Sequence, residues 1–133
     1  MPISGKILFV DDDSNFLSAL QRTFRGQFVF DIAGSALEAL ELMQKQGPYA
    51  VIVADISMPG MNGLELLVKV GELSPKTVQV LLTGNDDLDT FVAAVEGKNV
   101  FRFIAKPCES DALRALLVES LEQYRDRDGG LPS

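Results

Sequence analysis

Acidic side chains follow two of the apolar runs in this sequence. Asp11, Asp12 and Asp13 come directly after the first run, and Asp55 comes directly after the third. Carboxylates that stay ionised in one crevice repel one another unless a cation neutralises them, and ligands that are all oxygen select a hard ion. These residues therefore suggest a site for Mg²⁺, for which Mn²⁺ can substitute.

A hydroxyl group and an ammonium group complete the candidate chemistry. Thr83 follows the fourth apolar run, and Lys106 follows the fifth. A carboxylate, a hydroxyl and an ammonium around a magnesium ion suit phosphoryl transfer, because that reaction needs positioning and neutralisation of the charge on the phosphoryl oxygens. An aspartate is a reasonable nucleophile for this reaction, because its carboxylate can form an acyl phosphate.

The segments that must position these side chains alternate between strand-like and helix-like patterns. Short apolar runs, most of them rich in β-branched or aromatic residues, predict strands at 6–10, 28–33, 50–54, 78–82 and 100–105. The stretches between them have helical periodicity. In the first and fourth of these stretches the periodicity is carried by Phe16, Leu17, Leu20 and Phe24, and by Leu88, Phe91, Val92 and Val95.

The expected helices also carry boundary signals. Ser35 with Glu38 predicts a capping box at the start of the second helix, and Asn62 predicts the cap of the third. The last helix is defined by one apolar face, made of Leu113, Leu116, Leu117, Leu121 and Tyr124.

Repeated strand, helix, strand units of this length predict right-handed parallel connections, and hence an α/β fold with a doubly wound five-stranded parallel sheet and helices on both faces. Ligands of such sheets bind at the carboxyl ends of the strands, where the strand order reverses. In the flavodoxin-like order 2-1-3-4-5 that point lies between strands 1 and 3. Those two strands are the ones followed by carboxylates, so topology and chemistry indicate the same place.

Composition limits the classes of protein that fit. A chain of 133 residues with 47% hydrophobic residues suits one domain, which we place at 1–125, followed by a polar tail or linker stub at 126–133. The formal charge of -7 gives no basic patch, so we expect no direct binding of nucleic acid. The chain has no histidine, so any phosphohistidine must come from a partner.

The same sequence gives no sign of a membrane protein. Its apolar runs are far shorter than the ~20 residues of a membrane span, and the first residues lack the pattern of a secretory signal. The single cysteine, Cys108, fits a reducing compartment. We therefore expect the protein in the cytoplasm.

Four motifs, in this order and spacing, resemble the receiver domains of two-component response regulators, the CheY-like superfamily, over residues 5–125. They are ILFVDDD at 7–13, ADISMPGMNG at 54–63, LTG at 82–84 and FIAKP at 103–107. The resemblance implies a CheY-like (βα)5 fold and a switch that is phosphorylated by a partner histidine kinase.

The resemblance also assigns roles to individual residues. Asp55 would be the phosphoacceptor and a magnesium ligand, Asp12 a direct magnesium ligand, and Asp11 an acidic neighbour that acts largely through a metal-bound water. The backbone carbonyl of Ser57 would complete the ligand set.

On the phosphoryl side, Thr83 would donate a hydrogen bond to a phosphoryl oxygen. Lys106 would pair with Asp55 at rest and with the phosphoryl group after transfer, aimed inward by a cis peptide between Lys106 and Pro107. Phe103 matches the aromatic switch position, which is often Tyr in the family. An ordinary core role for Phe103 is the open alternative.

As a whole, the resemblance implies a receiver that is not an ordinary enzyme, although it catalyses its own phosphorylation and slow dephosphorylation. The output face would be the fourth helix, fifth strand and fifth helix, which would control an output domain or a downstream protein and could form a phosphorylation-dependent homodimer.

Three other interpretations stay open at this point. Asp13 can simply cap the first helix. The order Asp11-x-Asp13, Thr, Lys imitates haloacid-dehalogenase-like phosphatases, in which Asp11 would be the nucleophile; this needs a further acidic pair, for which only Glu109 and Asp111 follow the lysine. The chain can also be a pseudo-receiver that binds proteins without phosphorylation.

Overall fold

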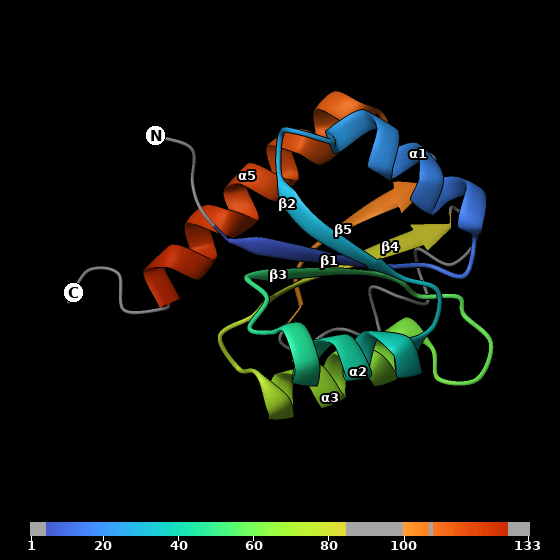
Figure 1. The fold of residues 1–133 in the computed structure, drawn as a ribbon, viewed down its shortest axis with the longest axis vertical. Coiled ribbons are helices and arrows are strands. Elements are labelled where there is room, and N and C mark those ends of the chain that lie inside the picture. The colour runs from blue at the N-terminus through green and yellow to red at the C-terminus, as the bar shows by residue number, and fades with distance from the viewer. Residues whose placement is uncertain (1–4, 85–99, 107, 128–133) are drawn as a thin grey trace.

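The elements of this structure, a computed structural model that describes residues 5–84, 100–106 and 108–127, alternate between strands and helices (Figure 1). In chain order they are β1 (Lys6–Val10), α1 (Ser14–Phe24), β2 (Val29–Ala33), α2 (Ala36–Gln46), β3 (Val51–Asp55), α3 (Gly63–Leu73), β4 (Val78–Gly84), β5 (Val100–Lys106) and α5 (Ser110–Arg127). The predicted fourth helix, with Leu88, Phe91, Val92 and Val95, lies outside the described residues.

The strands form one parallel sheet of five strands in the order β2-β1-β3-β4-β5. Helices α1 and α5 cover one face of the sheet, and α2 and α3 cover the other (Figure 1). The predicted α/β fold, its strand order and the placement of helices on both faces are therefore confirmed. The reversal of strand order lies between β1 and β3, because the chain builds outward from β1 in one direction and from β3 in the other.

Two separate cores hold the layers together, and β1 contributes to both. Ile7 and Phe9 pack in the core under α1 and α5, whereas Leu8 and Val10 pack in the core over α2 and α3. Successive strand residues point to opposite faces, so a strand covered on both sides needs an unbroken apolar run. This is why β1 and β3 stand out in the sequence.

Three strands extend beyond their predicted ends. Strand β3 includes Asp55, which pairs with Leu82, and the pairing of β4 with β5 continues to Gly84 and Lys106. Asp55, Thr83 and Lys106 therefore belong to the strands that they were expected to follow. Parallel backbone hydrogen bonds fix the backbone of all three residues, which makes their side chains better positioned than loop residues would be.

The helix starts follow the sequence signals with one exception. The Asn62 side chain accepts from Glu65 N–H while the Glu65 carboxylate accepts from Asn62 N–H, which is a complete capping box. At α2 the Ser35 hydroxyl accepts from Glu38 N–H, but the Glu38 carboxylate accepts from the N–H of Gly34 instead of Ser35. The predicted second capping box is thus only half formed.

Helix α5 ends later than the sequence suggested. It reaches Arg127, two residues into the segment predicted to be a tail. Its face of Leu113, Leu117 and Leu121 is buried against the sheet, as the periodicity indicated.

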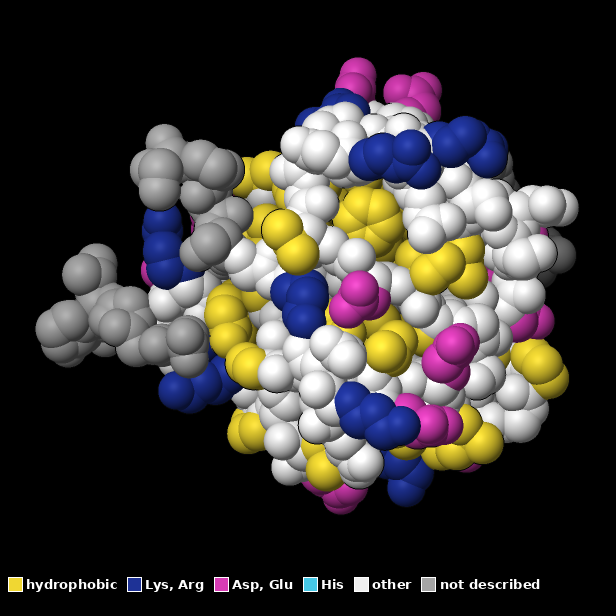
Figure 2. Space-filling model, in the orientation of Figure 1, with side chains coloured by type: hydrophobic (Ala, Val, Ile, Leu, Met, Phe, Trp, Pro, Cys, Tyr) yellow, Lys and Arg dark blue, Asp and Glu magenta, His cyan; other side chains and the backbone are white. Residues whose placement is uncertain are grey.

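Within the described ranges, no helix combines the length and the apolar character that crossing a membrane requires. On the face drawn in Figure 2, Lys and Arg side chains lie in several separate groups with acidic and hydrophobic side chains between them.

Candidate functional site

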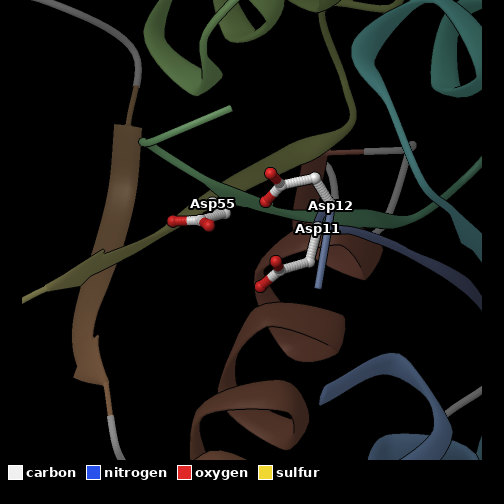
Figure 3. A group of neighbouring side chains, drawn as sticks. All are labelled: Asp11, Asp12 and Asp55. Atoms are coloured by element: carbon white, nitrogen blue, oxygen red, sulfur yellow. The ribbon is translucent and has the colours of Figure 1, made fainter. Parts of the chain in front are cut away.

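Three carboxylates meet where β1 and β3 end. Each of Asp11, Asp12 and Asp55 offers a carboxylate oxygen, and these oxygens all lie within 4.8 Å of one another. Asp11 and Asp12 turn their carboxylates toward the side on which Asp55 lies (Figure 3). Asp11 and Asp55 are buried, whereas Asp12 is exposed. This oxygen-only donor set, open to solvent on one side, suits a divalent cation that keeps some of its water ligands.

Asp13 does not belong to this cluster. Its carboxylate accepts hydrogen bonds from the N–H groups of Asn15 at 3.0 Å and Phe16 at 3.3 Å, and so caps α1. The helix-cap interpretation of Asp13 is therefore confirmed. The cap also orients the neighbouring site, because the Asp13 N–H donates to Asp11 Oδ1 at 2.9 Å.

Lys106 reaches the cluster from the end of β5. Its Nζ donates to Asp11 Oδ2 at 2.8 Å and to Asp55 Oδ2 at 3.4 Å. The shorter contact is therefore with Asp11, although the sequence pointed to Asp55 as the resting partner. A third contact was not expected from the sequence: Nζ lies over the ring of Phe16, 4.7 Å from its centroid.

The site holds more negative charge than one lysine can balance. Burial, and then the charge of Asp11, raise the pKa of Asp55 above its ordinary value, and the opposing attraction of Lys106 does not cancel them. Burial acts to lower the pKa of Lys106, but its hydrogen bonds and charge interactions with Asp11 and Asp55 raise it. The lysine is therefore firmly protonated, and the paired carboxylates favour an additional cation.

Thr83 places a hydroxyl at the same end of the sheet. Its side chain is fully buried, and its Oγ1 has no hydrogen-bond partner among the described residues. A buried hydroxyl without a partner costs about 1–3 kcal/mol. A group that costs this much at a strand end suits a ligand oxygen that arrives only during function.

The loop between β3 and α3 is packed tightly against the site. The Ser57 N–H donates to Asp55 Oδ1 at 3.2 Å, and the Gly63 N–H donates to the Ile56 carbonyl at 3.1 Å. A Cβ atom on Gly63 would overlap the backbone carbonyl of Asp55. The glycine is needed because the helix start and the strand end approach so closely.

The remaining site predictions have different outcomes. Phe103 is 44% exposed on β5, so the ordinary core role does not describe it. The cis peptide expected between Lys106 and Pro107 involves a residue outside the described ranges. The role of the Ser57 carbonyl stays a prediction. The residue that the sequence reasoning missed is Phe16, whose signal was its place in the first turn of the helix that follows the acidic residues.

The acidic pair that a dehalogenase-like phosphatase would need is not at this site. Asp111 is 91% exposed in its side chain and pairs with Arg114 on its own helix. Among the described residues, Asp11, Asp12 and Asp55 are the acidic groups that gather as a candidate metal centre. A phosphatase centred on Asp11 would also leave the buried Asp55 without a role.

Fold and site together define a doubly wound α/β domain with an acidic centre at its topological switch point. The sequence profile of the response regulator receiver domain matches residues 7–118. The chain therefore belongs to the response regulator receiver domain family.

Relatives of known sequence and structure agree. The chain is 31% identical over 124 residues to the DNA-binding transcriptional regulator NtrC of Escherichia coli, covering 92% of this chain and 26% of the relative. It is 30% identical over 125 residues to the hydrogenase transcriptional regulatory protein HoxA of Bradyrhizobium diazoefficiens, covering 94% of this chain and 26% of that protein. The chain thus spans about a quarter of the length of these curated relatives.

Two solved structures show the likeness of the whole domain. One is described as an adenylate cyclase from Rhodopirellula baltica, with a TM-score of 0.89, 38% identity, and coverage of 95% of this chain and 93% of that one. The other is a CheY-like response regulator receiver domain protein from Methanospirillum hungatei, with a TM-score of 0.82, 27% identity, and coverage of 92% and 98%.

Proposed function

We propose that this domain is a phosphorylation-dependent switch of a two-component system, which accepts a phosphoryl group from a sensor histidine kinase onto Asp55. The observation that carries the proposal is the convergence of three carboxylates within 4.8 Å with the ammonium of Lys106. Such a centre offers a nucleophile, a cation site and a fixed positive charge together.

In the proposed transfer, an oxygen of Asp55 forms a bond to phosphorus while the bond between phosphorus and the donor nitrogen breaks, and the electron pair returns to the imidazole of the kinase. Asp11, Asp12 and Asp55, with the backbone carbonyl of Ser57, would hold Mg²⁺ or Mn²⁺. When bound, the cation supplies neutralisation of the charge on the phosphoryl oxygens.

Two side chains of this domain would interact with the phosphoryl group on Asp55. The Lys106 ammonium compensates the new negative charge at the strand ends, where it already touches two carboxylates. The buried Thr83 hydroxyl, which has no partner among the described residues, donates to a phosphoryl oxygen. Because Thr83 pairs with Ala105 in the sheet, a shift of Thr83 reaches β5, where Phe103 is half exposed.

The output surface would consist of β5, α5 and the predicted fourth helix. Through it the domain would control an output domain or a downstream protein, or form a phosphorylation-dependent homodimer. The histidine kinase acts as donor, and the domain catalyses its own phosphorylation and slow dephosphorylation. The NtrC and HoxA relatives, whose names describe transcriptional regulators, support an output of this kind.

Intact-protein mass spectrometry tests the proposal. The chain is incubated with acetyl phosphate and Mg²⁺, beside the Asp55→Asn variant and a sample with chelator. We expect a gain of about 80 Da that needs Mg²⁺ and is lost in the variant. A gain that persists in Asp55→Asn would contradict the site. No gain in the folded wild-type protein would indicate a pseudo-receiver.

A further inference from the structure

The ammonium of Lys106 has a neighbour that the proposed mechanism does not use. The ring of Phe16 lies on α1, on the first turn after the acidic residues, and its centroid is 4.7 Å from Lys106 Nζ. Asp13 fixes the backbone of this turn, because its carboxylate accepts the N–H of Phe16. The backbone that carries the ring is therefore fixed relative to the end of β1.

The two carboxylates that this ammonium contacts among the described residues have a second task. Asp11 Oδ2 and Asp55 Oδ2 both accept from Lys106, and both residues belong to the cluster suited to a divalent cation. Their oxygens cannot satisfy the ammonium and a divalent cation equally well. Magnesium selects oxygen ligands, whereas the face of an aromatic ring attracts an ammonium. A bound metal ion would therefore compete with Lys106 for Asp11 and Asp55, but not for Phe16.

We propose that Phe16 is a positioning residue, whose ring keeps the Lys106 ammonium at the strand ends while the carboxylates serve the cation and the incoming phosphoryl group. The inference rests on the proposed function. A lysine side chain has four rotatable bonds, so without the ring the ammonium explores many positions away from the site. The ring limits this search without adding negative charge that would compete with the phosphoryl group.

The surroundings of Phe16 allow the ring to be changed selectively. Phe16, Lys106, Cys108 and Leu113 line a pocket of about 480 Å³, which leaves room for a larger aromatic side chain. Phe16→Tyr and Phe16→Trp keep an aromatic face, whereas Phe16→Leu keeps apolar volume and loses it. Phe30→Leu is a matched control, because Phe30 is also partly buried against the same core, with its ring 5.4 Å from Phe9.

The first measurement is the initial rate of acyl-phosphate formation with acetyl phosphate and Mg²⁺. We expect Phe16→Leu to be between about twofold and thirtyfold slower than the wild type, which is the range of a cation–π interaction. Phe16→Tyr or Phe16→Trp should restore the rate, and Phe30→Leu should leave it unchanged. Equal losses in the leucine and both aromatic variants would overturn the inference, as would a wild-type rate in Phe16→Leu.

The second measurement does not depend on phosphorylation. In ¹³C-lysine-labelled protein, the ring should shift the Lys106 Cε protons upfield, and Phe16→Leu should abolish this shift. Lys6 is the internal control, because its Nζ lies 4.7 Å from the ring centroid of Tyr49 and its signal should not change. A Lys106 signal that is the same in both proteins would overturn the contact.

The two measurements distinguish a failure of the proposed role of Phe16 from a failure of the proposed phosphorylation of Asp55. A wild-type chain that gains no phosphoryl group would overturn the proposed function and, with it, the role of Phe16 in the reaction. A wild-type chain that is phosphorylated, with Phe16→Leu equally fast, would overturn the role of Phe16 alone.

Discussion

Replacement of Gly63 by alanine tests whether the start of α3 must press against the strand that carries Asp55. A Cβ atom on Gly63 would overlap the Asp55 carbonyl oxygen and would lie 2.8 Å from the Asp55 carbonyl carbon and 2.9 Å from Ile56 Cα. All three neighbours are backbone atoms, so no side chain can rotate away. Carbon atoms in favourable contact are about 3.5–4.0 Å apart, so the loop must move by roughly 0.5–1 Å.

Overpacking of this kind costs about 1–3 kcal/mol of folding stability. Alanine is the better helix former by up to about 1 kcal/mol, which offsets part of the loss at this first helical position. The displaced backbone belongs to Asp55 itself, so the nucleophile moves with it. Because a misplacement of about 1 Å can cost a reaction about 100-fold, we expect a tenfold to 100-fold slower phosphorylation from acetyl phosphate.

Gly34→Ala is the matched control. Gly34 lies just before the cap of α2, and its Cβ would meet only the Glu38 carboxylate at 3.6 Å, an ordinary contact. We expect this variant to be unchanged or stabilised by up to about 1 kcal/mol, with a wild-type phosphorylation rate. Urea denaturation and intact-mass kinetics on both variants make the comparison. If Gly63→Ala matches Gly34→Ala in both measurements, the argument from close packing is wrong.

Four further outcomes follow from the same geometry. Mg²⁺ at 100 times its dissociation constant should stabilise the folded chain by about 2.7 kcal/mol. A melting temperature that is the same with and without Mg²⁺ would argue against the metal site. In chelator, Asp55→Asn should be more stable than the wild type at pH 7 and not at acidic pH. The reason is that the raised pKa of Asp55 makes its ionisation unfavourable in the folded state, so stability falls as pH rises through that pKa; equal denaturation midpoints at pH 7 would contradict this. Thr83→Val should retain or raise stability because it removes the unpaired buried hydroxyl, while weakening the phosphorylated state; destabilisation in urea would show that the hydroxyl has a partner. Tyr49→Phe should lose about 0.5–1.5 kcal/mol through its 2.5 Å hydrogen bond to Asp31, and unchanged urea denaturation would refute that contribution.

The sequence was sufficient for the strands and helices of the described residues and for the residues that gather, because both follow from simple periodic rules. Carboxyl ends of parallel strands share one edge of a sheet, so Asp11, Asp55 and Lys106 had to meet once the strands were recognised. The carboxylate and ammonium groups of these residues then indicated phosphoryl transfer. The strand ends were placed one or two residues early, since polar residues at strand ends look like loop residues until the backbone pairing is known.

Side-chain partners within the site could not be derived in the same way. Lys106 was expected to pair with Asp55 but lies closer to Asp11, a choice that depends on lysine rotamers and on the depth of each carboxylate. The contact of Phe16 with that ammonium depends on how α1 packs on the sheet, which the sequence pattern alone does not give. Asn62 predicted the cap of the third helix, but the close approach of Gly63 to the Asp55 backbone is a property of tertiary packing.

The resting site is poised for its proposed reaction by two imbalances. Three carboxylates face one ammonium, and burial together with Asp11 raises the pKa of Asp55, so a divalent cation relieves repulsion that is already present. The Thr83 hydroxyl is buried without a partner among the described residues, so an added acceptor oxygen gains a hydrogen bond that displaces no existing protein contact. The cation removes the repulsion between the carboxylates, and the phosphoryl group gives the Thr83 hydroxyl a partner. The free energy for switching is therefore partly stored in the folded, unphosphorylated domain. Asp55→Asn in chelator at pH 7 should raise the stability of the fold, Thr83→Val should retain or raise it, and both variants should impair the switch.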